Sequence, residues 1–323
     1  MRENELLNHF AKESAAIGSR FSRVLVGPGD DCAVLVGNGA GEGAKQLLKV
    51  DQLIEGRHFR TGTPLELVAR KALARPLSDI AAMGGRPVAC LCGAVLPTGF
   101  ADADAKRLFD AMRGWAERWE CPLVGGDLAA FAVGNGSTGP LVLSLTVLGE
   151  CVDEPVLRSS ARVGDGVYVT GEIGGSFDER TGLGKHVEFV PRIAEAGELV
   201  RVLGSGQGQG LHAMMDVSDG LGVDAGRIAR ASGVGILIEA DAVPLRSGDA
   251  DVLRACGDGE DYELLFTVAA GVAVPPVISV LREGKRENTR VTKIGRVVAG
   301  SGVVLSLRDG SAVEIGERGW EHR

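Results

Sequence analysis

The stretch MMDVSDGL at residues 214–221 indicates the kind of strand and helix arrangement from which this chain is built. An apolar run ends at Asp216, and Ser218 and Asp219 follow before a second apolar segment begins. This pattern predicts a strand that leads into a helix, with Ser218 as the N-cap and Asp219 in the first helical turn. Two carboxylates three residues apart can reach one cation, and a helix N-terminus suits a phosphate group.

Five more aspartates stand at the ends of apolar runs elsewhere in the chain. A single aspartate there is usually a turn or capping residue, but seven in one chain indicate a common role. Carboxylates gathered at strand ends suit Mg²⁺, a hard cation that prefers oxygen ligands and often accompanies nucleotide phosphates. In GPGDD the glycines would let backbone N–H groups approach a phosphate, with a plain hairpin turn as the alternative. The five are Asp30, Asp31, Asp51, Asp79 and Asp127.

Strands and helices are interleaved along the sequence, which predicts an α/β (α+β) fold. The length of 323 residues is typical of two domains. The character of the sequence changes near residue 150, without a Pro/Ser-rich linker. We therefore expect an N-terminal mixed α/β domain at residues 1–150 and a C-terminal α/β domain at residues 151–323.

One helix is expected to begin at the capping box Thr63-Pro64-Leu65-Glu66. Pro76 is expected to interrupt it, because proline removes a hydrogen bond and clashes with the preceding turn. Ser78 then offers a new start, which would place Asp79 in the first turn of a second helix.

Composition and charge exclude several classes of protein. The net charge of −8 leaves no broad basic field, so a nucleic-acid partner is not expected. There is no apolar leader after MRENELLNHF and no run of 18 apolar residues, which predicts a cytoplasmic protein without a membrane partner. The six cysteines include no C-x-x-C pair, which argues against a structural zinc site.

Taken together and in this order, the motifs resemble those of the thiamine-monophosphate kinase family, in the aminoimidazole ribonucleotide synthetase superfamily. The matching stretches include GPGDDCAV, VDQLIEGRHF, SDIAAMGG, MMDVSDGL, GEDYELLFTV and GERGWEHR, between residues 27 and 323. The resemblance implies direct transfer of the γ-phosphate of ATP, with Mg²⁺, to thiamine monophosphate. It also implies a homodimer in which the N-terminal domains form a barrel, with the nucleotide in a cleft between the two domains.

The resemblance assigns roles to particular residues by their position in the motifs. The implied Mg²⁺ ligands are Asp30, Asp51, Asp79, Asp127, Asp216 and Asp219. The implied ATP contacts are Gly126, Asp127, Arg158 and Ser218. The implied contacts to thiamine monophosphate are His58, Glu260 and Trp320. No general base is expected, because the phosphate that attacks is already ionised near pH 7.

Three positions depart from the family's pattern. Val50 stands where threonine or serine is usual, Leu128 where threonine is usual, and Arg75 where asparagine is usual. Each change removes a polar group near the expected phosphate site, so we expect an active enzyme with one weakened metal site, for which Arg75 or Lys49 could compensate. The alternatives are a divergent ATP-dependent relative acting on another small substrate, and a non-catalytic homologue that binds nucleotide or thiamine phosphate.

Overall fold

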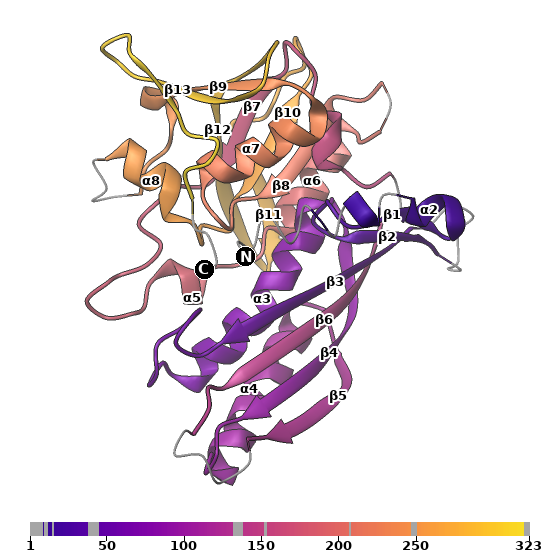
Figure 1. The fold of residues 1–323 in the computed structure, drawn as a ribbon, viewed down its shortest axis with the longest axis vertical. Helices are drawn as coiled ribbons and strands as arrows, with labels where there is room; N and C mark the ends of the chain where they lie inside the picture. The colour runs from indigo at the N-terminus through magenta and orange to yellow at the C-terminus, as the bar shows by residue number, and fades with distance from the viewer. Residues whose placement is uncertain are drawn as a thin grey trace.

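The protein consists of two domains, each built on its own sheet, and so has the two-domain α/β class expected from the sequence (Figure 1). Within the described part of the chain, no helix has the length and apolarity needed to cross a lipid bilayer. The structure is a computed structural model and describes residues 9, 12–14, 16–37, 45–131, 138–151, 154–206, 208–246 and 251–319.

The N-terminal domain holds, in its described residues, a six-stranded sheet of order β1-β2-β3-β6-β4-β5. Every pair is antiparallel except β4 with β5. Every second residue of β6 is buried, because one face of the sheet packs against α3 and α4. The elements are α2 (Ile17–Arg20), β1 (Val24–Val26), β2 (Ala33–Val36), β3 (Lys45–Ile54), α3 (Leu65–Ala82), β4 (Arg86–Leu96), α4 (Asp102–Arg118), β5 (Leu123–Ala130) and β6 (Val142–Cys151).

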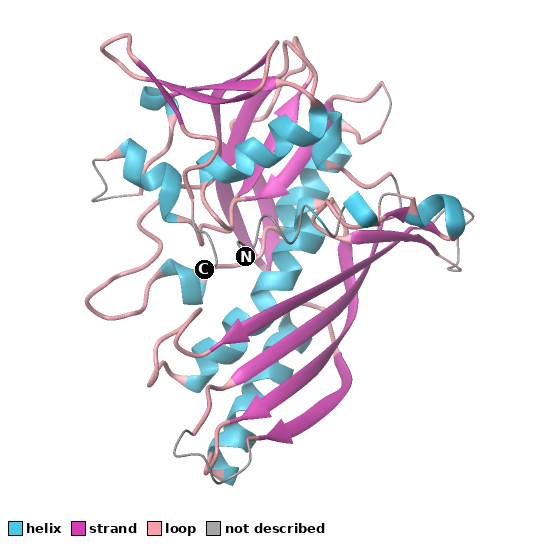
Figure 2. Ribbon diagram, viewed as in Figure 1, coloured by secondary structure: helices cyan, strands magenta, loops and turns pink. Residues whose placement is uncertain are grey.

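The other face of this sheet carries exposed apolar side chains, and no described helix covers it (Figure 2). Thr146 of β6 pairs with Val50 on one side and with Leu91 on the other, so these three residues form a row across the face. Val50 is 57% exposed and Leu91 is 46% exposed. A contiguous apolar surface of this kind is typical of a protein–protein contact.

The helix α3 runs without a break through Pro76, so the expected interruption there is wrong. Thr63 does not cap it either: the N-cap position is Pro64, and the Thr63 hydroxyl donates to the carbonyl of Arg60 instead. As a consequence Asp79 lies in the last turn of a long helix rather than in the first turn of a short one. Burial of almost the whole second half of α3 outweighs the hydrogen bond that proline removes.

The C-terminal domain holds, in its described residues, an eight-stranded sheet of order β14-β13-β9-β12-β7-β10-β8, with β11 paired to β12. One face packs against α7 and the other against α6. The elements are η1 (Arg158–Ser160), β7 (Gly166–Thr170), α5 (Lys185–Glu188), α6 (Ile193–Leu203), β8 (Leu211–Asp216), α7 (Leu221–Ser232), β9 (Gly235–Glu239), η2 (Ala240–Ala242), α8 (Val252–Asp258), β10 (Leu264–Val268), β11 (Val277–Arg282), β12 (Lys285–Val298), β13 (Gly302–Ser306) and β14 (Ala312–Glu314).

Candidate functional site

Three buried aspartates meet where the two domains join. Asp31 follows β1, Asp79 lies near the end of α3, and Asp216 is the last residue of β8. One carboxylate oxygen from each lies within 4.8 Å of the others, and each residue is at most 7% exposed. Three carboxylates so close together repel one another unless a cation lies among them. This acidic cluster is the strongest candidate metal site among the described residues.

Basic and hydroxyl groups surround the acidic cluster. Arg158 makes an ion pair with Asp31, and its backbone N–H donates to Asp30 Oδ2 at 3.1 Å. Lys49 Nζ donates to Asp79 Oδ1 at 2.7 Å, and the Ser78 hydroxyl donates to Asp216 Oδ2 at 2.6 Å. These contacts fix the direction of each carboxylate.

Burial dominates the electrostatics of the acidic cluster. It raises the pKa of Asp216 to about 6, and the charge of Asp31 adds to the shift. It likewise raises the pKa of Asp30 to about 6, again with a contribution from Asp31. Burial also raises the pKa of Asp79 well above its usual range, although Lys49 opposes the shift. The protein thus holds carboxylates whose negative charge is poorly stabilised, which favours binding of a divalent cation.

The turn after Asp216 is stabilised by Asp224, to which no sequence motif assigned a role. Asp224 Oδ2 accepts hydrogen bonds from the backbone N–H groups of Ser218, Asp219 and Gly220, at 3.0 to 3.1 Å. The helix α7 begins only at Leu221 and has no side-chain cap, so the expected capping by Ser218 and the first-turn position of Asp219 are both wrong. The Asp219 carboxylate instead pairs with Arg227 at 2.6 Å.

The remaining predicted metal ligands lie outside the cluster within this chain. Asp51 lies on β3, with Lys49 Nζ at 3.7 Å and Arg75 Nε at 3.9 Å. Asp127 is exposed on the edge strand β5, in register with Gly93 of β4. The family resemblance assigned a metal-binding role to Asp30 and none to its neighbour Asp31. In the structure it is Asp31 that lies in the cluster with Asp79 and Asp216.

The three departures from the family's pattern fall in two different places. Val50 is 57% exposed on the face of the N-terminal sheet that no described helix covers, and Leu128 is 60% exposed on the edge strand β5. Arg75 points inward, where its guanidinium donates to the carbonyl of Gln52 at 2.7 Å and approaches Asp51. The cations Arg75 and Lys49 therefore neutralise part of the charge of Asp51 and Asp79.

The residues expected to contact thiamine monophosphate lie near one another on the two domains. Lys71 of α3 donates to the carbonyl oxygen of His58 at 2.7 Å and to Glu260 Oε1 at 2.6 Å. The His58 ring is oriented by the N–H of Ile54, which donates to Nδ1 at 2.9 Å. Trp320, the third expected contact, lies outside the described residues.

The segment Gly259–Glu263 connects this pair to the acidic cluster. The N–H of Glu260 donates to the carbonyl of Ser218 at 2.7 Å, and that of Tyr262 donates to Val217 at 2.8 Å. Glu260 and Tyr262 have φ values of 56° and 51°, a backbone conformation that side chains other than glycine rarely adopt. Such strain persists only where the surroundings fix it, which is common at functional sites.

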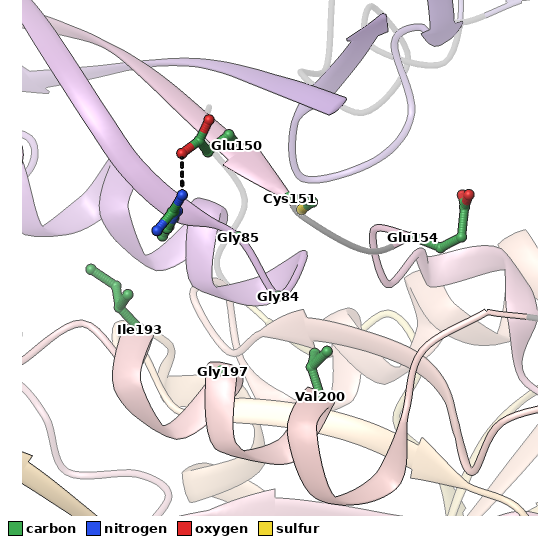
Figure 3. Close-up of a pocket in the computed structure, with 9 residues that line it drawn as sticks. Gly84, Gly85, Glu150, Cys151, Glu154, Ile193, Gly197 and Val200 are labelled. Atoms are coloured by element: carbon green, nitrogen blue, oxygen red, sulfur yellow. Dashed lines mark ion pairs between the residues drawn. The ribbon is translucent and has the colours of Figure 1, made fainter. Parts of the chain in front are cut away.

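A crevice of about 200 Å³ opens between α6 and the turn after α3, and none of the three aspartates of the acidic cluster lines it (Figure 3). Glu150 and Glu154 lie among its lining residues, and Arg86 there is paired to Glu150 at 2.7 Å. Because its charges are acidic or already paired, this crevice does not suit a phosphate.

Comparison with known proteins identifies the family to which both domains are related. Residues 29–151 match the family model of the AIR synthase related protein, N-terminal domain, and residues 162–308 match that of the C-terminal domain. A thiamine-monophosphate kinase of Rhodopirellula baltica is 32% identical over 314 residues, which are 93% of this chain and 92% of that relative.

The chain belongs to the thiamine-monophosphate kinase family. Another member, the thiamine-monophosphate kinase of Bacillus subtilis, is 34% identical over 77% of this chain and 79% of its own length. The solved structure of AaThiL complexed with AMPPCP and TMP has a TM-score of 0.77 and 28% sequence identity, and covers 100% of this chain and 99% of that one. The family resemblance expected from the motifs is thereby confirmed.

Proposed function

We propose that this chain transfers the γ-phosphate of ATP to thiamine monophosphate and releases thiamine diphosphate and ADP. The observation that carries the proposal is the acidic cluster of Asp31, Asp79 and Asp216, to which both domains contribute, in a chain whose relatives are thiamine-monophosphate kinases. We propose that residues 1–150 supply dimerisation and part of the ATP and metal site, and that residues 151–323 complete it. The cytoplasmic location stays a prediction.

The donor set of the acidic cluster fits Mg²⁺. Its oxygens are carboxylates, and burial is the main cause that raises the pKa values of Asp79 and Asp216, a cost that a bound cation would relieve. We infer that Asp31, Asp79 and Asp216 hold the ion, with Asp30 and Asp219 beside them. Mg²⁺ would neutralise charge on the phosphates of ATP.

This chain's own residues would do the remaining work by positioning. A phosphate monoester has its second pKa near 6, so the attacking oxygen is ionised at pH 7 and no side chain need remove a proton. Arg158 would contact the phosphates as part of the ATP site, together with the turn at Ser218. His58 and Glu260 would hold the thiamine end, with Glu260 accepting a hydrogen bond from the aminopyrimidine. Catalysis would then rest on orientation and charge stabilisation.

We also propose that two copies pair through the exposed face of the N-terminal sheet, as the dimeric barrel expected from the resemblance. β5 lies three strands from β3, so about 14 Å of sheet separates Asp127 from Asp51 within one chain. Pairing through this face would let Gly126 and Asp127 of one protomer complete the site of the other. Leu91→Asp should yield monomers in sedimentation velocity, whereas Leu281→Asp, at a 73% exposed position on β11, should not.

The proposed activity is tested by incubating the purified protein with ATP, Mg²⁺ and thiamine monophosphate, and separating products by chromatography. Thiamine diphosphate should form, and Asp216→Asn should lower its rate by at least about 100-fold, because the variant removes one carboxylate of the cluster. Absence of product from the unaltered protein, with ATP still bound, would favour another small substrate or a non-catalytic homologue.

A further inference from the structure

Lys71 is a fully buried lysine that neither the motifs nor the proposed phosphoryl transfer uses. It lies in the middle of α3, in the N-terminal domain, and its ammonium group reaches across to the C-terminal domain. Burying an ammonium group is costly unless it is paired and hydrogen-bonded. Its retention at this depth therefore requires partners that satisfy it completely.

The three N–H groups of the Lys71 ammonium have three acceptors. They are the carbonyl oxygen of His58 at 2.7 Å, His186 Nδ1 at 2.8 Å and Glu260 Oε1 at 2.6 Å. An ammonium has three donors and no acceptor, so this set uses its whole capacity. Two of the three partners are the residues that the proposed function places against thiamine.

The tautomer of His186 follows from its own surroundings. The ring is fully buried, and Nε2 lies 3.2 Å from the carbonyl oxygen of Gly182, which can only accept. Nε2 therefore carries the proton, and Nδ1 accepts from Lys71. Glu260 Oε2 also lies 3.2 Å from Nδ1, a contact that would bond only a protonated ring. The shorter Lys71 contact, at 2.8 Å, favours the neutral ring.

Lys71 also decides the charge state of Glu260. Burial alone raises the pKa of Glu260, but the charge of Lys71 and the hydrogen bond that Lys71 donates oppose burial and hold the pKa below its ordinary value. Burial lowers the pKa of Lys71 itself to about 8, against the opposing charge of Glu260. Near pH 7 the pair is thus ionised, and Glu260 can only accept hydrogen bonds.

We propose that Lys71 is a positioning residue for thiamine monophosphate, which holds Glu260 as an oriented hydrogen-bond acceptor and fixes the His58 backbone beside it. This inference rests on the proposed function. None of the described hydrogen bonds of Lys71 goes to the acidic cluster, where the proposed function places the phosphates of ATP. Its removal should therefore weaken recognition of thiamine monophosphate and leave ATP recognition unchanged.

The test compares Lys71→Met with Lys185→Met as a matched control. Lys185 also forms a buried ion pair, with Glu263 at 2.5 Å, but does not contact Glu260 in the described interactions. Lys71→Met should raise KM for thiamine monophosphate by about 30-fold, since losing one partner of a buried charge pair costs about 2 kcal/mol or more. KM for ATP should stay within about twofold. Equal KM values for thiamine monophosphate in the two variants would overturn the proposal.

Calorimetric binding of thiamine monophosphate to the unaltered protein, without ATP, gives a second measurement that needs no variant to fold. The titratable groups facing Lys71 are Glu260 and His186 across the junction and Arg75 on its own helix, while Tyr262 faces Glu260. Affinity should fall severalfold between pH 7 and pH 9 as Lys71 loses its proton, whereas the substrate phosphate stays fully ionised. An affinity that does not change over this range would refute the role of Lys71.

The two proposals fail in different ways. If thiamine monophosphate binds with the expected pH dependence but no thiamine diphosphate forms, the proposed transfer is wrong and the positioning role of Lys71 stands. If product forms at the normal KM in Lys71→Met, the transfer stands and the positioning role is wrong.

Discussion

Replacing Glu263 by glutamine should destabilise the C-terminal domain by about 3 kcal/mol at pH 7. The Glu263 carboxylate is 1% exposed and accepts from Arg192 Nε and Nη2, both at 2.7 Å, from Lys185 at 2.5 Å and from the Thr170 hydroxyl at 2.7 Å. Burial raises its pKa, but Arg192 and Lys185 outweigh burial and bring the pKa to about 2.

The magnitude follows from linkage between protonation and folding. The pKa of Glu263 falls from 4.5, its ordinary value, to about 2 in the folded protein. A difference of about 2.5 pKa units corresponds to about 3 kcal/mol of stability, present above pH 4.5 and lost as the pH falls through 2. Glutamine resembles the protonated carboxyl, so the variant should lack this stabilisation at every pH. The difference in free energy of unfolding between the unaltered protein and the variant should shrink to about 2 kcal/mol at pH 3.5.

Urea-induced unfolding followed by circular dichroism measures both quantities. Glu198→Gln is the control, because the Glu198–Arg201 ion pair lies on the surface, with Arg201 69% exposed, and should contribute less than about 0.5 kcal/mol. The reasoning would be refuted if Glu263→Gln lowered the free energy of unfolding by less than about 1 kcal/mol at pH 7. It would also be refuted if the difference between the two proteins did not change with pH.

Two further predictions concern the N-terminal sheet. Gly126→Ala should destabilise the protein by at least about 2 kcal/mol in thermal unfolding, because an added Cβ would lie 1.9 Å from the carbonyl oxygen of Cys92. The control is Gly114→Ala on α4, where an added Cβ would meet open space. This variant should stabilise the protein by about 0.5–1 kcal/mol. Mixing Asp127→Asn with Asp216→Asn should recover about a quarter of the normal activity, because random pairing makes half the dimers hybrids and each hybrid has one intact site. Equal stability of the two glycine variants, or no recovered activity after subunit exchange, would contradict these expectations.

Much of the fold could be predicted from the sequence because apolar runs and glycine turns are local signals. The strand ending at Asp216 is present where its pattern indicated it, and the helix expected near Thr63-Pro64-Leu65-Glu66 begins at Leu65. Asp216 was recognisable for the same reason, since it ends its apolar run, but the expected position at a strand end is wrong for Asp51 and Asp127, which lie inside β3 and β5, and for Asp79, which lies in α3. What these patterns did not indicate is which carboxylates meet, because Asp31, Asp79 and Asp216 converge only through tertiary packing.

Because Pro76 predicted a break in α3, the residues that this helix contributes to the site could not be recognised from the sequence as one surface. Lys71, Arg75, Ser78 and Asp79 follow at intervals of four, seven and eight residues, which places them on one helical face. An expected break at Pro76 divides this pattern into two unrelated pieces, so neither piece indicates a shared surface. Proline propensity is a local preference, and here burial of α3 between the two domains overrides it.

The continuity of α3 also fixes a distance inside the proposed active site. Lys71 and Asp79 are eight residues apart on one helix, so their backbone positions are separated by about 12 Å along its axis. Lys71 marks the thiamine end and Asp79 the metal end, and the separation between them is therefore set by helical geometry rather than by how the two domains pack. Domain movement could shift Glu260 and Asp216, but the helix would keep the same spacing. A single residue inserted near Pro76 would rotate one end by about 100° relative to the other, and both ends could not then face the same substrate.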